Sequence, residues 1–306
     1  MIPLHYADEV FDALNSGKPV VALESTIITH GLPYPHNRNA ALAIESEVRA
    51  AGAIPATIAV LDGQIHIGLE QTTLQRLVAA KDPMKLSRAD LAMCLSQGRI
   101  GSTTVAATMI CAELAGINVF ATGGIGGVHR GAEHSFDISA DLQQLGLSAL
   151  SVVSAGAKAI LDLPKTLEVL ETLGVAVIAY QQDHFPAFWS RDSGLAAPLR
   201  LDTAAQIAAA HLMRKDLNLR GSQLIANPIA EADEIPRQVI EPVVNEALKS
   251  AMAQKVSGKA MTPYLLNRIY ELTAGKSLST NLSLVKSNAR LGAAIAIEIQ
   301  KQQGPA

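Results

Sequence analysis

Two residues, Lys158 and Glu24, combine a reactive side chain with a position that favours catalysis. Lys158 follows the apolar run ALSVVSAGA and, alone among the lysines, has alanine on both sides. Burial disfavours the ammonium form, and a neutral lysine amine is the nucleophile that Schiff-base chemistry requires. Glu24 directly follows VVAL, where a poorly hydrated carboxyl group can act as a general acid. The alternatives are a lysine that reaches solvent from a strand end and a glutamate that hydrogen-bonds the next loop.

A glycine-rich segment, residues 121–141 (ATGGIGGVHRGAEHSFDISAD), is a further candidate for ligand binding. Closely spaced glycines allow backbone N–H groups to approach a ligand. The segment is not a dinucleotide fingerprint, because His129 stands where the last glycine of G-x-G-x-x-G would be and no helix follows directly. The spacing of His129, Glu133 and His134 also differs from that of known helical zinc motifs.

Two carboxylates of the same segment suggest a cation site. A helix is expected from Asp137 onward, which would place Asp137 and Asp141 on one helix face. Such a pair suits a hard divalent cation that keeps most of its water. The alternative is an N-capping aspartate followed by a solvated one.

The segment 101–109 (GSTTVAATM) and Lys85 could together bind a phosphate. Small residues open an expected helix at 103, and the free N–H groups and dipole of a helix N-terminus favour an anion. Lys85, in MKLSRAD, would supply the counter-charge. A plain Ser/Thr cap and a surface lysine are the alternatives.

Elements that would position these residues follow an α/β pattern, because short β-branched runs alternate with Ala- and Leu-rich helical patterns. Strands are expected at 19–24, 118–124, 147–158, 175–181 and 222–229, and helices at 36–52, 70–80, 88–97, 103–116, 137–146, 162–174, 202–217, 236–256, 262–274 and 278–301. Asp62-Gly63 predicts a hairpin within 54–69. No linker divides the chain. We therefore predict one three-layer α/β/α domain over residues 1–306, with a largely parallel central sheet and the β-hairpin as an appendage.

Ligands of open parallel sheets bind beyond the carboxyl ends of the strands. Glu24, Thr122 and Lys158 each follow an apolar run. We therefore expect these polar side chains to lie close together at that edge of the sheet. The aromatic segment 185–194, which contains Trp189, forms either a flap over the site or a core plug or oligomer contact.

Composition limits the classes of function. The chain has 306 residues, of which 49% are apolar and 17% charged, so it can bury a large core. No apolar run approaches the length of a spanning helix, and the first twelve residues lack the features of a signal peptide, so we expect a cytoplasmic protein. A net charge of −3 without a basic block argues against binding to long nucleic acid, but it is compatible with binding of a small anionic substrate. Cys94 and Cys111 are interpreted as buried small hydrophobes.

Together these motifs resemble the pseudouridine-5′-phosphate glycosidase family, which includes indigoidine-synthase-A-like proteins. The resemblance covers essentially the whole chain. It is carried by PVVALESTIITHGLPYP, PATIAVLDGQIHIGL, KLSRAD, TTVAATM, FATGGIGGVHRGAEHSFDISADL, SAGAKAILDL, ANPI, TPYLLNRIYELT and SLSTNLSLVKSNA.

The resemblance implies roles for individual residues. Lys158 would be the covalent nucleophile, Glu24 the proton donor, and Asp137 the anchor of a divalent metal, typically manganese, held mostly through water. The implied substrate-binding residues are Lys85, Val105, Thr122, His129, Ser139, Ala140, Asp141 and Asn281. The resemblance also implies a cytoplasmic homo-oligomer, a trimer.

The implied reaction is reversible cleavage of the C–C glycosidic bond of pseudouridine 5′-phosphate to uracil and ribose 5-phosphate, in pseudouridine catabolism. It would proceed through a Schiff base between Lys158 and the ring-opened ribose, without nucleic-acid or membrane partners. Two alternatives stay open. Another Schiff-base lyase or aldolase acting on a sugar phosphate would not release uracil. A non-catalytic sugar-phosphate-binding accessory protein of a pigment pathway would need neither Lys158 nor Glu24.

Overall fold

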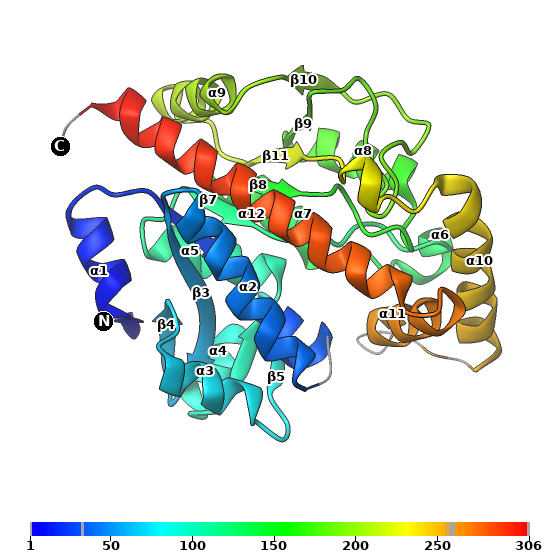
Figure 1. Ribbon diagram of the computed structural model, residues 1–306, viewed down its shortest axis with the longest axis horizontal. Coiled ribbons are helices and arrows are strands. Elements are labelled where there is room, and N and C mark those ends of the chain that lie inside the picture. The colour runs from blue at the N-terminus through cyan, green and yellow to red at the C-terminus, as the bar shows by residue number, and fades with distance from the viewer. Residues whose placement is uncertain (1, 32–33, 255, 257–260, 305–306) are drawn as a thin grey trace.

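The computed structural model describes residues 2–31, 34–254, 256 and 261–304, and its centre is a mostly parallel sheet (Figure 1). The strand order is β1-β4-β3-β2-β7-β8-β11-β9-β10, and β5 and β6 join the sheet through β3. The strands are β1 (Leu4–Tyr6), β2 (Val20–Leu23), β3 (Ile54–Leu61), β4 (Gln64–Ile67), β5 (Met84–Leu86), β6 (Gly101–Thr103), β7 (Val119–Ala121), β8 (Ser151–Ser154), β9 (Ala176–Tyr180), β10 (Leu199–Leu201) and β11 (Gln223–Ala226).

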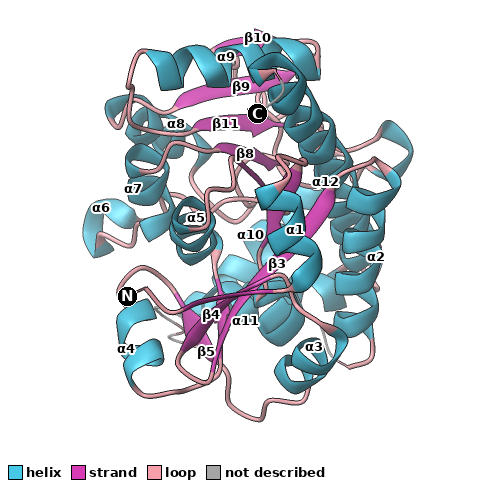
Figure 2. Ribbon diagram, turned by 90° about the vertical axis from the view of Figure 1, so that its left-hand side faces the viewer, coloured by secondary structure: helices cyan, strands magenta, loops and turns pink. Residues whose placement is uncertain are grey.

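Helices cover both faces of this sheet, which gives the predicted three layers (Figure 2). Helices α2, α9 and α12 pack along one another on one face, and α5, α7 and α8 lie on the other. The α-helices are α1 (Asp8–Asn15), α2 (His36–Ala50), α3 (Gln71–Val78), α4 (Leu91–Ser96), α5 (Val105–Leu114), α6 (Ala132–Ser135), α7 (Ala140–Leu147), α8 (Leu163–Thr172), α9 (Ala204–Asp216), α10 (Arg237–Ala253), α11 (Met261–Leu272) and α12 (Lys276–Gln303). Two short helical turns are η1 (Ile27–Gly31) and η2 (Glu231–Asp233).

The central strands are mainly apolar because both faces of the sheet are covered. Every residue of β2 (VVAL), β8 (SVVS) and β11 (QLIA) is buried. Strands β2, β7, β8, β11 and β9 are parallel neighbours, so their carboxyl ends meet at one edge. Helices α10 and α11 lie beyond that edge (Figure 1).

The expected hairpin is present and is continuous with the central sheet. Residues 54–57 of β3 pair in parallel with β2, whereas residues 58–61 pair antiparallel with β4. The turn is formed by Asp62 and Gly63, which have φ angles of 53° and 74°. Positive φ at both positions is what a two-residue hairpin turn requires. Strand β3 therefore joins the hairpin to the rest of the sheet.

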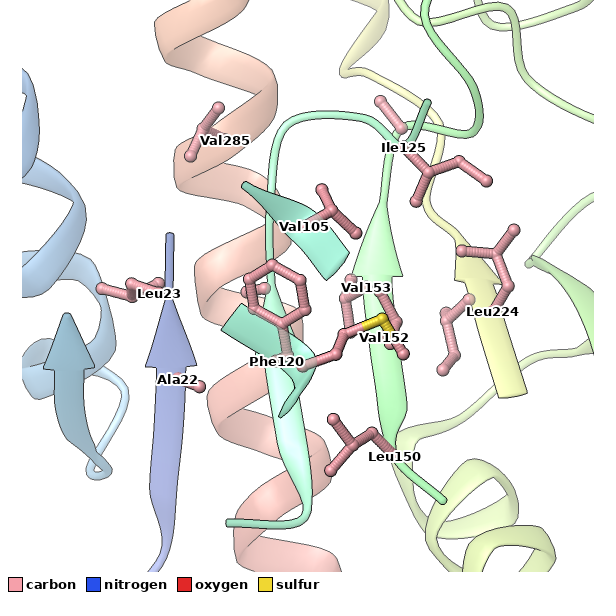
Figure 3. Close-up of a cluster of buried hydrophobic side chains, with 14 of the residues drawn as sticks. Ala22, Leu23, Val105, Phe120, Ile125, Leu150, Val152, Val153, Leu224 and Val285 are labelled. Carbon is pink, nitrogen blue, oxygen red and sulfur yellow. The ribbon is translucent and has the colours of Figure 1, made fainter. Parts of the chain in front are cut away.

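The long helix α12 crosses the sheet at close range because it carries small residues. A Cβ on Gly292 would lie 3.3 Å from the Cβ of Ala121 and 3.4 Å from Cγ1 of Val21. Helix α12 contributes Val285 to a buried cluster that also includes Leu23 and Val105 (Figure 3). Within the described ranges, no helix has both the length and the apolar character needed to cross a membrane.

Several boundaries differ from the sequence prediction. Residues 101 and 102, expected to form a turn, and residue 103, expected to begin a helix, form β6, which pairs with β5 and β3. The helix expected from 137 begins at Ala140, so residues 137–139 precede it. Strand β1, helix α1 and the short helix α6 were not expected. The last three expected helices correspond to α10, α11 and α12, although residue 255 of the expected 236–256 segment lies outside the described residues.

Candidate active site

A cavity of about 290 Å³ opens at the carboxyl ends of the parallel strands. Segments far apart in the sequence line it, including the ends of β2 and β7, the loop after β8, the N-terminus of α5, and helices α11 and α12. The predicted site residues that line it are Glu24, Lys85, Val105, Thr122, His129, Ser139, Asp141, Lys158 and Asn281. The other two, Ala140 and Asp137, are not among the lining residues.

Glu24 is held in place by hydroxyl groups from two neighbouring segments. Thr26 Oγ1 donates a hydrogen bond to Glu24 Oε2, and Thr122 Oγ1 donates to Glu24 Oε1. Thr122 follows β7, which pairs with β2 immediately before Glu24. The alternative interpretation of Glu24, as the hydrogen-bonding partner of the next loop, is thus partly right. The same carboxylate also lines the cavity.

Lys158 lies on the loop after β8, and two glycine-dependent contacts fix this loop. The N–H of Lys158 donates to the carbonyl of Ile125 at 3.1 Å, and the N–H of Ile125 donates to the carbonyl of Gly156, also at 3.1 Å. Gly156 has φ 80°, and a Cβ there would lie 2.6 Å from the carbonyl oxygen of Pro186. This explains the SAGAK sequence, because only glycine fits that position.

The Lys158 side chain is half-buried and reaches the cavity. Among the described residues, none forms an ion pair or a hydrogen bond with its amine. With no carboxylate held against it by the described residues, the amine is sterically accessible to an electrophile in the cavity.

Two histidines near the cavity lysines are biased toward the neutral form. Burial lowers the pKa of His129, with the positive charge of Lys158 adding to the effect and Asp137 opposing it. Burial likewise lowers the pKa of His30, and Lys85 adds to that shift while Asp82 opposes it. The cavity therefore holds two lysines and two imidazoles biased toward the neutral form, together with the carboxylates of Glu24 and Asp141.

Asp141 has a structural environment that the sequence did not predict. Its side chain is buried, with 6% of the residue exposed. Oδ1 accepts the N–H of Ala106 at 2.9 Å, and Oδ2 accepts the N–H of Gly126 at 2.8 Å. The expectation that Asp137 and Asp141 share a helix face is wrong, because Ser139 caps α7 and leaves Asp137 outside the helix.

The glycine-rich segment is packed closely against protein groups. A Cβ on Gly126 would lie 2.2 Å from Ser139 Oγ, and one on Gly124 would lie 2.7 Å from the Phe188 ring. A Cβ on Gly127 would lie 2.5 Å from Thr166 Oγ1. These glycines are therefore required for packing within the chain. Gly124 and Gly126 also line the cavity, as predicted for a ligand-binding segment.

Trp189 is a core residue, as one interpretation of the aromatic segment predicted. It is 1% exposed, and its indole N–H donates to Asn281 Oδ1 at 2.6 Å. The neighbouring Phe188 lines the cavity. Cys94 and Cys111 are buried, and burial raises the pKa of both thiols, that of Cys111 to about 12, as expected of inert cysteines.

Sequence reasoning did not select His30, and it considered Thr26, Thr104 and Phe188 only as members of longer segments; all four line the cavity. Thr104 immediately precedes α5, and its buried hydroxyl has no partner among the described residues. The Ser/Thr cap signal in GSTT pointed to this position. Phe188 adopts φ 62°, a backbone conformation that no pattern around it signals.

Asp137 is the one predicted metal ligand, and its carboxylate is open to solvent. Its side chain is 40% exposed, with Oδ2 4.0 Å from Nδ1 of His129. Asp141 has both oxygens bonded to backbone N–H groups and is not available as a second ligand. In the part of the chain that is described, no group of three or more His, Cys, Asp or Glu residues could hold a metal ion.

A family model described as "Indigoidine synthase A like protein" matches residues 9–298. The chain belongs to this family. Among similar proteins, the pseudouridine-5′-phosphate glycosidase of Jannaschia sp. (strain CCS1) is 64% identical over 96% of this chain and 98% of its own length. The pseudouridine-5′-phosphate glycosidase of Staphylococcus aureus (strain MW2) is 51% identical over 97% of both chains. Because such relatives are enzymes, this indigoidine synthase A-like protein is an enzyme.

Solved structures confirm the fold of this family member. The prealnumycin C-glycosynthase AlnA, in complex with ribulose 5-phosphate, superposes with a TM-score of 0.92 at 37% identity, covering 99% of both chains. An indigoidine synthase A-like protein from Thermotoga maritima superposes with a TM-score of 0.88 at 31% identity, covering 98% of this chain and 97% of its own. The α/β class and the largely parallel sheet are thereby confirmed.

Proposed function

We propose that this enzyme cleaves the C–C glycosidic bond of pseudouridine 5′-phosphate, reversibly, to uracil and ribose 5-phosphate. The observation that carries the proposal is the presence of Lys158 and Glu24 in one cavity, where no carboxylate of the described ranges pairs with the Lys158 amine. Relatives named for this activity, 51% and 64% identical over nearly the whole chain, support the choice of substrate. The likeness to a C-glycosynthase in complex with a sugar phosphate supports chemistry at a C-glycosidic bond.

The chemistry requires both residues because a C–C glycosidic bond has no leaving heteroatom to protonate. Glu24 gives a proton to the ribose ring oxygen, and the ring opens as uracil donates electrons to C1′. The neutral amine of Lys158 adds to C1′. Protonation of uracil at C5 then allows the C1′–C5 bond to break, and its electron pair goes to uracil. An iminium remains on Lys158, and water hydrolyses it to ribose 5-phosphate and the free amine.

The two threonines that hold Glu24 contribute by orientation. Thr26 and Thr122 fix the two carboxyl oxygens, so the proton is delivered from a defined position. Lys85 and the N-terminus of α5 at Val105 would bind the phosphate, since a cation and the dipole of a helix N-terminus complement its charge, although Asp141 already accepts the N–H of Ala106 in that turn. Ser139 and His129 complete the polar lining.

A divalent cation, manganese, is proposed at Asp137. Asp137 would hold it largely through water, and His129 lies beside that carboxylate. Bound there, the cation would add positive charge beside His129, which lines the cavity. The homotrimer and the cytoplasmic location implied by the family resemblance stay predictions, which sedimentation and cell fractionation would test.

The test is to incubate the purified protein with pseudouridine 5′-phosphate, with manganese or with a chelator, and to measure uracil and ribose 5-phosphate. Lys158→Ala is the matched variant. We expect metal-dependent release of both products by the native protein and none by the variant. Borohydride added with ribose 5-phosphate should give a stable adduct at Lys158, visible by mass spectrometry.

The same experiment separates the rival functions. An aldolase-type lyase would consume a sugar phosphate without releasing uracil. An accessory binding protein would bind ribose 5-phosphate without turnover and without a borohydride adduct. Normal turnover by Lys158→Ala would refute covalent catalysis while leaving the substrate assignment standing.

A further inference from the structure

The hydrogen bond between Trp189 and Asn281 fixes the orientation of an amide in the cavity wall. Trp189 is the only tryptophan of the chain, and its indole N–H can donate but not accept. The atom of Asn281 that faces it at 2.6 Å must therefore be the oxygen, Oδ1. A flipped amide would place two donors against each other in a buried place.

Trp189 itself has little freedom to move. Its ring meets Phe188 edge to face, with centroids 5.1 Å apart and planes at 69°. Its carbonyl accepts the N–H of Ile235 at 3.0 Å. Because the Trp189 side chain is fixed, the more flexible Asn281 amide is the group that adjusts, and it turns its oxygen toward the indole N–H. The NH₂ group of Asn281 has no protein partner among the described residues, so it is the group left for a ligand.

The wall around Asn281 is otherwise apolar. Leu278, Asn281, Leu282 and Val285 line the cavity at helical spacing along one face of α12. Phe188 adds an aromatic surface, while the cationic Lys85 belongs to a different segment, strand β5. Apolar faces with one in-plane donor suit a flat heterocyclic base better than a phosphate or a sugar.

We propose that Trp189 is a positioning residue that makes Asn281 an obligatory donor and so selects a base with a carbonyl oxygen at the matching ring position. This inference deepens the proposed function and rests on it for the identity of the base. A base that presents an amino group at that position would meet the Asn281 NH₂ donor and be rejected.

The single tryptophan permits a direct test. Benzothienylalanine, which has sulfur in place of the indole N–H, can replace tryptophan through a tryptophan auxotroph, and only position 189 changes. Protein that contains 5-fluorotryptophan, which keeps the N–H, is the matched control. The substrates are pseudouridine 5′-phosphate and its two analogues in which an amino group replaces one ring carbonyl oxygen, pseudocytidine and pseudoisocytidine 5′-phosphates.

We expect the control protein to cleave one of the analogues with a kcat/KM at least about tenfold below that of pseudouridine 5′-phosphate. In the benzothienylalanine protein the two substrates should have nearly equal kcat/KM values, because the Asn281 amide can turn its oxygen toward the cavity. Asn281→Asp provides a second variant. One carboxylate oxygen would accept from Trp189 and the other would face the cavity, so this variant should favour the amino-bearing analogue. Unchanged discrimination in both altered proteins would overturn the proposal.

A second readout does not require turnover. The ¹⁵N-labelled indole N–H of Trp189 gives one resonance, which Asn281→Ala should shift and make faster to exchange with solvent. Uracil added to the native protein should also perturb it. An indole resonance that neither change affects would refute the positioning role. If uracil perturbs the resonance but no substrate is cleaved, the proposed function fails while the positioning role stands.

Discussion

Replacing Asp141 with asparagine should destabilise the whole fold as well as impair the enzyme. Asp141 connects two walls of the cavity, because one oxygen accepts the N–H of Ala106 at the start of α5 and the other accepts that of Gly126. Asparagine has the same shape but only one acceptor oxygen. Its NH₂ group would therefore face one of the two backbone donors.

The expected loss follows from these contacts. A hydrogen bond to a charged acceptor contributes about 1.5–3 kcal/mol, and a buried N–H left without a partner adds about 1 kcal/mol or more. Asp141→Asn should therefore lower the free energy of unfolding by about 3 kcal/mol. For 306 residues, an unfolding entropy of about 2.1 cal/mol/K per residue converts this loss to a fall in Tm of about 5 °C.

Thermal and urea denaturation measure this loss, and Asp137→Asn is the matched control. Asp137 is partly exposed, so its substitution should leave the free energy of unfolding within about 0.5 kcal/mol of the native value. The reasoning is refuted if Asp141→Asn unfolds like the native protein yet is inactive. Asp141 would then act on the substrate, as the family resemblance implies.

Three further outcomes are expected. Glu24→Gln should lose most of the rate of uracil release while substrate binding, measured by calorimetry, is retained, because only a transferable proton is removed; equal loss of binding would make Glu24 structural. Asp137→Ala should raise the manganese concentration needed for half-maximal activity, and an unchanged requirement would remove Asp137 from the metal site. Burial, with Lys215 and Arg214 adding to it, lowers the pKa of His211 to about 4. Because the unfolded histidine titrates near 6.5, the unfolded state binds more protons between pH 6.5 and 4, so acidification should cost about 3 kcal/mol of stability there. In urea denaturation at several pH values, His211→Gln should lack that part of the pH dependence, and an unchanged profile would contradict the buried neutral form.

Features that depend on local pattern could be predicted from the sequence. The run VVAL placed Glu24 at the end of a buried strand, because a continuous apolar run is typical of a strand that is covered on both faces. Asp62-Gly63 located the hairpin turn, since few dipeptides adopt positive φ at both positions. The rule that ligands bind at the carboxyl ends of parallel strands then predicted that Glu24, Thr122 and Lys158 lie together, and all three line one cavity.

Features that depend on distant contacts were not predictable in this way. FDISAD offers both Asp137 and Ser139 as helix caps, and the periodicity does not choose between them. Ser139 is the cap in the fold, and Asp141 is bonded to residues 35 and 15 positions earlier in the chain. Strand β6 is only three residues long, which is too short for an alternation of apolar and polar residues to be recognised in the sequence. Its pairing with β3 determines its conformation.

The contacts of Asp141 and Gly126 also explain why residues that resemble a ligand-binding motif in the sequence have a structural role in the fold. Loops at the carboxyl ends of strands lack a ladder to satisfy their N–H groups, and buried N–H groups must find acceptors. Here the carboxylate of Asp141 accepts from a loop and from a helix N-terminus at once, and it can approach the loop only because Gly126 has no Cβ. An aspartate and glycines beside a cavity can therefore be needed to hold the cavity walls together as well as to bind substrate. The residues free to react are those whose polar atoms the fold leaves unpaired, and Lys158 is the clearest of these among the described residues.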